Sequence, residues 1–376
     1  MTLRPVLRKI FAGLFFVLII ASTIGAIIHR EKIVRLEEDP SKSHEALYYD
    51  RLFGNIVQCR LCPNLCILAP GQYGSCKARK NINGKLYSMV YGKIATAHLD
   101  PIEKKPFFHV LPGATAFSIA TSGCNLQCLF CQNWEISQVF PFDIPTASAT
   151  PQQVIEQALA SGTKAIAFTY SEPTISFEYV LDIAKLAHAA GLKTLVVSNG
   201  YIEQKPLKEL LKYIDAYKVD FKGFDEGFYK KMTAGHLQPV LETMKTIRQA
   251  RVWLEIVNLL VTNQNDSDDQ IRGLARWIKN NLGNDVPLHF SRFSPQYKLL
   301  NVPATPTDTV IHARDIAMQE GLKYVYTGNI DFPPGEITLC PSSGEKIIVR
   351  QGMFTIYNRL KDGACTDGEI IPGIWN

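Results

Sequence analysis

The chain has 376 residues, of which 46% are hydrophobic and 20% are charged, a composition typical of a globular enzyme with more than one folded unit. Its formal net charge of +5 is small for this length, and no long basic block or basic–aromatic alternation occurs. Binding to nucleic acid is therefore not expected. The nine cysteines are grouped along the chain, and these groups carry most of the functional information.

An apolar stretch lies near the amino terminus. Residues 10–28 contain no charged side chain, and a helix of this length spans about 28 Å, close to the ~30 Å hydrocarbon core of a bilayer. A cleaved signal peptide is the alternative, but the apolar region is long for one and no clear Ala-x-Ala site follows it. We predict an uncleaved transmembrane anchor, with its flanks, over residues 1–35. Basic residues lie at both ends of the stretch, so they do not decide its orientation.

A linker and a small cysteine-bearing module are predicted over residues 36–113. Lys85–Tyr91 and Lys93–Ala97 have the pattern of short strands, and Asn83-Gly84 is a typical hairpin turn. The cysteines of this module are Cys59, Cys62, Cys66 and Cys76. They supply a full ligand set for a second metal centre, either zinc or an iron–sulfur cluster, and thiols without a metal are the third possibility.

Three further cysteines, Cys124, Cys128 and Cys131, have the spacing C-x3-C-x2-C after a predicted strand, and Phe130 precedes the last of them. Three thiolates from one loop suit a [4Fe-4S] cluster with one iron lacking a protein ligand, whereas clusters that only carry electrons usually have four cysteines. A structural zinc loop or three unrelated buried thiols is the alternative. The run resembles the signature of radical S-adenosylmethionine (SAM) enzymes.

This resemblance implies the cofactors and the partners. In that family the open iron binds the amino and carboxylate groups of SAM, and an electron from the cluster breaks a carbon–sulfur bond to give a 5′-deoxyadenosyl radical. The expected cofactors are a [4Fe-4S] cluster and SAM, with Phe130 against the adenine, and the expected electron donor is a protein such as flavodoxin or ferredoxin. Because such a cluster requires reducing conditions, we predict a single-pass membrane protein whose chain after about residue 35 is cytoplasmic.

Strand and helix patterns alternate from about residue 114 to residue 330. The predicted strands are Ala116–Ser122, Ala165–Tyr170, Thr194–Ser198, Ala216–Phe221, Trp253–Val261, Leu288–Phe293 and Tyr324–Thr327. The predicted helices cover 151–161, 175–190, 205–214, 238–250, 267–282 and 307–320. This alternation predicts an α/β fold with parallel strands, in a barrel or a doubly wound sheet. The family resemblance favours a partial TIM-type barrel, with its site at the carboxyl ends of the strands.

Polar residues occur where these predicted strands end. The run Thr169–Thr174 stands where the family has a Gly-Gly-Glu-Pro-like motif, but Tyr170 and Ser171 replace the glycines. The resemblance implies that Glu172 meets the amino group of SAM through a charge-assisted hydrogen bond. Without the resemblance, the same run is typical of a helix start.

Two further strand ends contribute candidate cofactor contacts. The resemblance places Ser198 and Asn199 near the ribose or carboxylate of SAM, although Asn-Gly is also a common turn. Asp220 and Lys222 are similar to an Asp-x-Lys run of glycyl-radical-enzyme activases, and a surface ion pair is the simpler interpretation. Glu255 lies within the predicted apolar strand Trp253–Val261, where a buried carboxylate needs a partner. No catalytic residue is assigned.

The segment 331–376 is similar to a degenerate zinc ribbon. The family often has Cys-Pro-x-Cys-Gly and Cys-x-x-Cys-Gly here, whereas this chain has Cys340-Pro-Ser-Ser-Gly and Cys365-Thr-Asp-Gly. Two thiolates are too few for a four-coordinate structural zinc site. We therefore predict no metal in this segment, and a ribbon that is held by packing.

Further runs, including Asp100–His109 and Cys131–Ser137, resemble the radical SAM component of the AmmeMemoRadiSam system from about residue 54 onward. The other components of that system are thus possible partners. The family is related to pyruvate formate-lyase activating enzymes, but this relationship does not name a substrate. We predict a membrane-anchored radical SAM enzyme with an unknown substrate. The alternatives are an activase acting on a glycine of a partner protein, and a membrane-tethered redox or sensor protein that never cleaves SAM.

Overall fold

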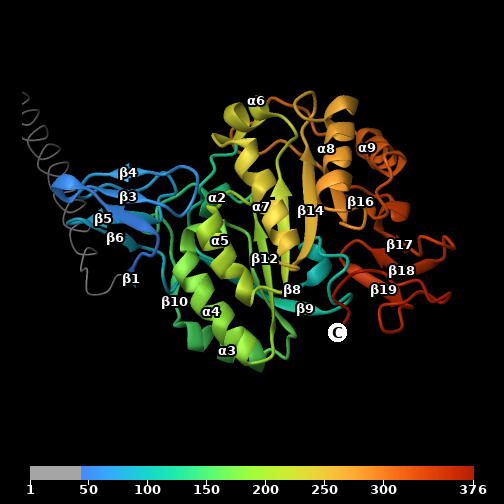
Figure 1. Cartoon of the computed structure of the whole chain (residues 1–376), viewed down its shortest axis with the longest axis horizontal. Coiled ribbons are helices and arrows are strands. Elements are labelled where there is room, and N and C mark those ends of the chain that lie inside the picture. Colours follow the sequence, from blue (N-terminus) through green and yellow to red (C-terminus); the bar gives the residue numbers. More distant parts are fainter. Residues whose placement is uncertain (1–43) are drawn as a thin grey trace, which may run out of the picture. The chain divides into compact units, whose positions relative to one another are not determined.

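The computed structural model describes residues 44–376 (Figure 1). The predicted transmembrane stretch, residues 10–28, lies outside the described residues. Among the helices that the model does describe, none combines the length and the apolar character needed to cross a bilayer.

A central sheet of eight strands organises the described chain. Its strands are β8 (Thr96–Pro101), β9 (Thr115–Ala120), β11 (Ala165–Phe168), β12 (Lys193–Ser198), β13 (Ala216–Phe221), β14 (Trp253–Leu260), β15 (Leu288–Arg292) and β16 (Val325–Gly328). From β9 to β16 each strand is parallel to the next one along the chain, whereas β8 is antiparallel to β9. A doubly wound sheet reverses its strand order, so this alternative is wrong, and the predicted α/β fold with a mostly parallel sheet is confirmed.

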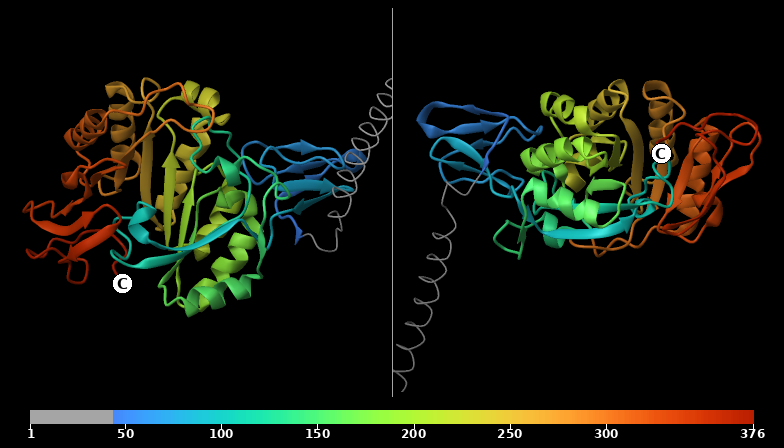
Figure 2. Two further views of the ribbon diagram at one scale, coloured as in Figure 1. Left: turned by 180° about the vertical axis from the view of Figure 1, so that it is seen from behind. Right: turned by 90° about the horizontal axis from the view of Figure 1, so that it is seen from below.

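Helices connect the parallel strands. The long ones are α3 (Pro151–Ala160), α4 (Phe177–Ala189), α5 (Gln204–Leu210), α7 (Leu237–Gln249), α8 (Asp268–Asn281) and α9 (Thr307–Gln319). Right-handed crossovers that always step in one direction place the helices on one face of the sheet. Helices such as α4, α5 and α7 accordingly lie in front of the strands in Figure 1, and the strands lie in front when the molecule is turned around in Figure 2.

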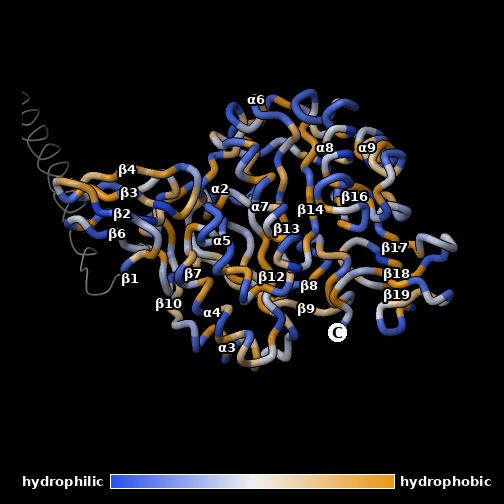
Figure 3. Tube along the Cα trace, in the orientation of Figure 1, coloured by the Kyte–Doolittle hydropathy of each residue, from blue (hydrophilic) through white to orange (hydrophobic). Residues whose placement is uncertain are grey.

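The core lies between this sheet and its helices. All four residues of β11 are buried, and α7 buries an apolar stripe that includes Val240, Met244 and Ile247. Figure 3 shows the hydrophobic residues concentrated along strands such as β12 and β14. Because these parallel strands are mostly buried, apolar residues dominate them, as in the Ala-Ile-Ala-Phe sequence of β11, which explains why the strands could be located from the sequence.

The four-cysteine module consists of small antiparallel sheets. Its strands are β1 (His44–Glu45), β2 (Tyr49–Arg51), β3 (Val57–Cys59), β4 (Ile67–Leu68), β5 (Arg79–Ile82) and β6 (Lys85–Ser88). Asn83 and Gly84 connect β5 to β6 with positive φ angles of 52° and 85°, which confirms the predicted turn. The predicted strand Lys93–Ala97 is wrong as a unit, because β7 (Lys93–Ile94) pairs with β10 (Ala147–Ser148) and β8 joins the central sheet.

A buried ion pair joins this module to the sheet-and-helix core. The Arg79 guanidinium donates to both carboxylate oxygens of Glu178 in α4, and both side chains are at most 2% exposed. Arg79 also donates to the backbone carbonyls of Leu47 and Ile175. A buried charge is tolerated only when it is paired and hydrogen-bonded, so this contact fixes how β5 packs against α4.

A second buried network partners Glu255, as the sequence required. Glu255 accepts hydrogen bonds from the Phe108 and His109 amides and contacts His289 Nε2 at 2.8 Å. His109 contacts the hydroxyl of Tyr326 and the carbonyl of Pro372. Glu255 and His289 occupy the first half of their strands, away from the carboxyl ends, so this network supports the fold.

The final strands, β17 (Thr338–Leu339), β18 (Lys346–Gln351) and β19 (Phe354–Asn358), form an antiparallel sheet. Cys340 and Cys365 are joined by a disulfide. The prediction that this segment is held by packing is therefore incomplete, because the two remaining ribbon cysteines bond to each other. Asp367 lies within 4.8 Å of both sulfur atoms, and a count of thiolates alone overlooked this carboxylate.

Candidate active site

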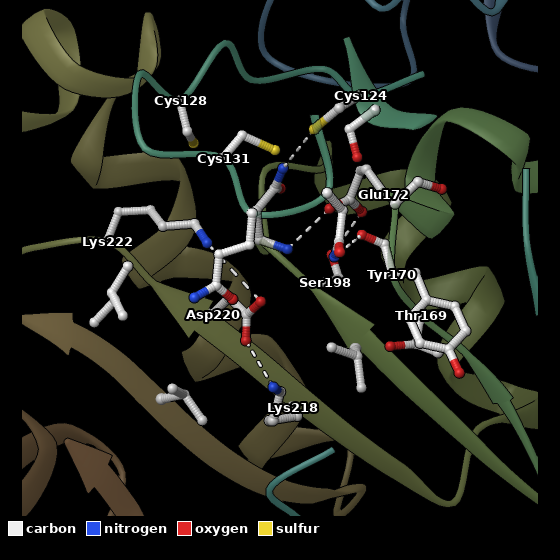
Figure 4. A pocket seen from close by; sticks show the side chains of 18 of the residues that line it. Cys124, Cys128, Cys131, Thr169, Tyr170, Glu172, Ser198, Lys218, Asp220 and Lys222 are labelled. Atoms are coloured by element: carbon white, nitrogen blue, oxygen red, sulfur yellow. Dashed lines mark hydrogen bonds and ion pairs between the residues drawn. The ribbon is translucent and has the colours of Figure 1, made fainter. Parts of the chain in front are cut away.

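A cavity of about 500 Å³ opens at the carboxyl ends of the parallel strands (Figure 4). Its wall combines residues from the loop after β9 with residues that follow β11, β12 and β13. This edge of the sheet is where α/β folds of this strand order bind their ligands. The cavity lies in the size range of small-molecule sites.

All three cysteines of the C-x3-C-x2-C motif line this cavity as free thiols. Figure 4 shows them projecting from one loop toward the same space. Two backbone hydrogen bonds hold the loop, from Gln127 N to the Thr233 carbonyl and from Leu129 N to the Met232 carbonyl. Burial raises the pKa of the Cys124 thiol far above its usual value and that of Cys128 to about 12. Such thiols become thiolates when a metal supplies positive charge, so the site fits an iron–sulfur cluster.

Phe130 also lines the cavity and is 3% exposed. Its ring packs against Phe228 with the ring centroids 6.0 Å apart. Phe228 ends a short helix, α6 (Glu226–Phe228), which is followed by a π-helical turn over Tyr229–Thr233. The residue beside the third cysteine is thus fixed in an apolar wall, as expected for a contact with a flat ring.

Glu172 is a hub that binds two other candidate residues, Ser198 and Asn199. Its carboxylate accepts hydrogen bonds from Ser198 Oγ at 2.7 Å, from Asn199 N at 2.9 Å and from Thr174 N at 3.0 Å. Burial raises the pKa of Glu172 above its usual value, and these hydrogen bonds oppose the rise. An ionised Glu172 can accept a further hydrogen bond from an ammonium group in the cavity.

Asn199 connects this hub to the cysteine loop. Its side-chain amide donates to Asn125 Oδ1 at 2.9 Å and lies 3.7 Å from Cys124 Sγ. Asn125 in turn donates to the carbonyl of Tyr201. The sequence did not single out Asn125, because an asparagine inside a cysteine motif carries no signal of its own. The contacts join β11, β12 and the cysteine loop at one point.

Asp220 and Lys222 both line the cavity, and Lys218 lies with them. Lys218 Nζ is 2.8 Å from Asp220 Oδ1, whereas Lys222 Nζ is 3.8 Å from Asp220 Oδ2. The prediction paired Asp220 with Lys222 and overlooked the closer Lys218. Alternate residues of a strand share one face, and this rule could have found it. Burial lowers the pKa of Lys222, but Asp220 and the three thiols raise it on balance.

A further charged group on the cavity wall was not assigned from the sequence. Lys104 and Lys105 each contact Asp100 at 2.9 Å, and the Tyr170 hydroxyl also donates to Asp100. Tyr170 stands at a glycine position of the family motif and has a positive φ of 65°, a conformation that glycine adopts without strain. Burial lowers the pKa of Lys105 to about 8. These contacts span up to 70 residues of sequence, so no local pattern reveals them.

Comparisons with known proteins agree with this site. Residues 118–278 match the Radical SAM superfamily model. The uncharacterized protein MJ0808 of Methanocaldococcus jannaschii is 45% identical over 306 residues, which are 81% of this chain and 91% of that protein. A pyruvate formate-lyase-activating enzyme of Clostridium pasteurianum is 25% identical over 48% of this chain and 81% of its own. A GTP 3′,8-cyclase of Lactiplantibacillus plantarum is 28% identical over 65% and 71%, respectively.

This family implies a [4Fe-4S] cluster and SAM as cofactors, and its relatives include activating enzymes and cyclases that catalyse different reactions. A shared fold does not transfer a substrate between them. The chain belongs to the radical SAM superfamily and is a radical SAM enzyme whose substrate is unknown.

Proposed function

We propose that the chain is the radical SAM component of an AmmeMemoRadiSam system, attached to the membrane by residues 10–28. The proposed parts are the anchor with its flanks (1–35), the four-cysteine module (36–113), a partial barrel of the radical SAM type (114–330) and the ribbon-like segment (331–376). Support for the system comes from the run Asp100–His109, whose lysines border the cavity. The other components of the system would be its protein partners.

The observation that carries the chemistry is that three free thiols and the Glu172 hub face one cavity. In the proposal, Cys124, Cys128 and Cys131 hold the cluster and leave one iron for SAM. When bound, this pair of cofactors supplies a 5′-deoxyadenosyl radical, with the electron delivered by a donor such as flavodoxin or ferredoxin. The cofactor makes the oxidant, so the protein has to supply orientation and a dry pocket.

The side chains of this site have distinct proposed roles. Glu172 accepts a hydrogen bond from the ammonium of SAM, while Ser198 and Asn199 hold the Glu172 carboxylate and border the ribose or carboxylate of SAM. Phe130 contacts the adenine. Asp220 and Lys222 approach the cofactor from β13, and the charge on Lys222 favours the thiolate forms of the nearby cysteines.

Anaerobic reconstitution tests this proposal. The chain is loaded with iron and sulfide, reduced with dithionite and incubated with SAM, and 5′-deoxyadenosine is quantified. Its formation supports the enzyme. A bound cluster without 5′-deoxyadenosine supports the alternative of a membrane-tethered redox or sensor protein. Genes for the other components beside this one would support the AmmeMemoRadiSam assignment.

An activase is the second candidate, because several relatives are named activating enzymes of a lyase, a decarboxylase or a dehydratase. It would abstract hydrogen from a glycine of a partner protein. A glycyl radical signal on a co-encoded partner after incubation with SAM and reductant would favour this candidate over a small-molecule substrate.

The membrane attachment is tested separately. We propose that the chain after about residue 35 faces the cytoplasm, because the cluster requires reducing conditions. In this proposal the Cys340–Cys365 disulfide persists in a compartment where disulfides are rare. An enzyme reporter that is active only in the cytoplasm, fused to the carboxyl terminus, should be active in the membrane fraction. Activity only of a reporter that requires export would contradict the orientation. Removal of residues 1–35 should release the protein from membranes.

The proposal includes a second metal centre at the cysteines of the amino-terminal module. Zinc and an iron–sulfur cluster are both compatible with four thiolates.

A further inference from the structure

Four free cysteines line a second, smaller cavity, separate from the active-site cavity. The cysteines are Cys59, Cys62, Cys66 and Cys76. Cys59, Cys62 and Cys76 are buried and Cys66 is half-buried. Cys59 ends β3 and the others lie on the loops between β3 and β5. The fold thus brings together four thiols that span 18 residues of sequence and leaves them unbonded.

The spacing of these thiols distinguishes a single ion from a cluster. Zinc–sulfur bonds are about 2.3 Å long, so two thiolates on one zinc lie no more than about 4.6 Å apart. Within residues 44–376, the group of three or more metal-ligating side chains whose ligand atoms all lie within 4.8 Å of one another is Cys340, Cys365 and Asp367. The four thiols therefore do not have the spacing of a mononuclear site, and neither do the three thiols of the active site, which the family assigns to a cubane.

The four thiols surround one small space. The cavity that they line has a volume of about 10 Å³, which is room for about one water-sized sphere. Gly74 borders this space, since a Cβ at this position would make ordinary contacts with Cys76 Sγ at 3.6 Å and with Cys66 Sγ at 3.8 Å. The four side chains therefore converge on one small enclosed space, where a metal group that they share would be bound.

The surroundings also suit a cluster. Arg79 lines the cavity, is 1% exposed and is paired with Glu178, so its guanidinium lies beside the four thiolates that a metal would create. Leu61, Leu68 and Ile175 supply an apolar wall. A cluster with four thiolate ligands carries net negative charge, which a nearby guanidinium stabilises at low dielectric.

The four-cysteine module directly contacts the loop that carries Cys124, Cys128 and Cys131. The Asn64 side chain donates to the Asn125 carbonyl at 2.7 Å. Gly123, which precedes Cys124, packs so closely on the Cys76 carbonyl that a Cβ would lie 2.5 Å from this oxygen. Because the loops of the two thiol sets touch, a group held by one lies beside a group held by the other.

We propose that Cys59, Cys62, Cys66 and Cys76 bind a second iron–sulfur cluster, in which every iron has a cysteine thiolate ligand. A cluster that is fully ligated by cysteine has no open iron for SAM and serves electron transfer. The inference rests on the proposed function only for the reducing compartment, since its ligands are independent of the active-site cysteines.

The test compares two variants of the full chain after anaerobic reconstitution. The trio variant replaces Cys124, Cys128 and Cys131 with alanine, and the quartet variant replaces Cys59, Cys62, Cys66 and Cys76. Iron, acid-labile sulfide and zinc are measured per chain, and the dithionite-reduced samples are examined by electron paramagnetic resonance. We expect the trio variant to retain roughly half of the wild-type iron and sulfide, with a signal that SAM does not change.

The outcomes separate this inference from the proposed function. A trio variant without iron, or with zinc in place of iron and sulfide, overturns the proposal of a second cluster but does not contradict the proposed cluster at the active site. A trio variant with as much iron as the wild type contradicts the active-site cluster instead. The trio variant leaves the four thiols untouched, so the result does not depend on whether the quartet variant folds.

A steric variant adds a finer check. In the trio background, Gly74→Val fills the space between Cys66 and Cys76 and should lower the remaining iron at least several-fold. Ser75→Ala is the matched control, since Ser75 lines the same cavity without a thiol and loses only its hydroxyl contact with Cys66 Sγ at 3.4 Å, and it should retain the iron. Equal iron in both variants would contradict a cluster in this cavity.

Discussion

Glu172→Gln tests the hub of the proposed SAM site. Glutamine retains the shape of the side chain, and its remaining oxygen can still accept from Ser198 Oγ and Thr174 N. Its amide group would face the Asn199 N–H, which now donates to the second carboxylate oxygen at 2.9 Å. The variant therefore loses one internal hydrogen bond and the negative charge that receives the ammonium of SAM.

The magnitude follows from these two losses. A hydrogen bond to a charged group contributes about 1.5–3 kcal/mol, so the dissociation constant for SAM should rise about 10- to 150-fold. Ser198→Ala is the matched control, because it removes one donor and keeps the charge, and it should weaken SAM binding less than about 10-fold. Both constants are measured by anaerobic calorimetry on protein with a full cluster.

The pH dependence of binding gives a second readout of the same carboxylate. Burial raises the pKa of Glu172, so SAM affinity in the wild type should fall as the pH is lowered through this raised pKa. The Glu172→Gln variant should lack this titration. Affinities within a factor of two of wild type, with an unchanged pH profile, would show that Glu172 does not contact SAM.

Three other predictions concern stability. Burial lowers the pKa of His109 to about 4, so between pH 6.5 and 4 the unfolded chain binds a proton that the folded chain excludes. The free energy of unfolding should therefore fall by about 3 kcal/mol as the pH drops through this range. Urea unfolding of His109→Phe should show a smaller fall, and a fall identical to that of the wild type would refute this assignment. Arg79→Met leaves Glu178 buried without its partner and should lower the free energy of unfolding by about 3–5 kcal/mol. The double variant Arg79→Met, Glu178→Leu should recover part of this loss. A single variant as stable as the wild type in thermal unfolding would contradict the buried pair. The Cys340–Cys365 disulfide closes a loop of 25 residues and should contribute about 3 kcal/mol to the free energy of unfolding. Reductant should therefore lower the melting temperature of the wild type but leave that of Cys340→Ala unchanged.

Most strands of the central sheet were predictable because their burial makes them short, mainly apolar segments between the helix patterns. β13 was predicted to the residue as Ala216–Phe221, and β11 differs only at its end. β8 was not assigned to this sheet, because it is an edge strand with exposed residues such as His98 and Leu99. An edge strand lacks the hydrophobic alternation that identifies a half-buried one.

The site divides in a similar way. Cys124, Cys128 and Cys131 could be found because all three lie within one loop and their spacing is itself the signal. Asp100 and Tyr170 meet only in the folded chain, across 70 residues, so their contact carries no local pattern. The same limit applies to Cys340 and Cys365, whose pairing depends on how β17 and the final turns pack.

The most direct test of the account is the effect of SAM on the electron paramagnetic resonance spectrum of the reduced chain. With the four cysteines of the amino-terminal module replaced, the remaining cluster signal should change when SAM is added, because SAM binds the open iron. The signal should vanish when Cys124, Cys128 or Cys131 is replaced by alanine. A signal that ignores SAM, or that survives these replacements, would contradict a SAM-binding cluster at this loop.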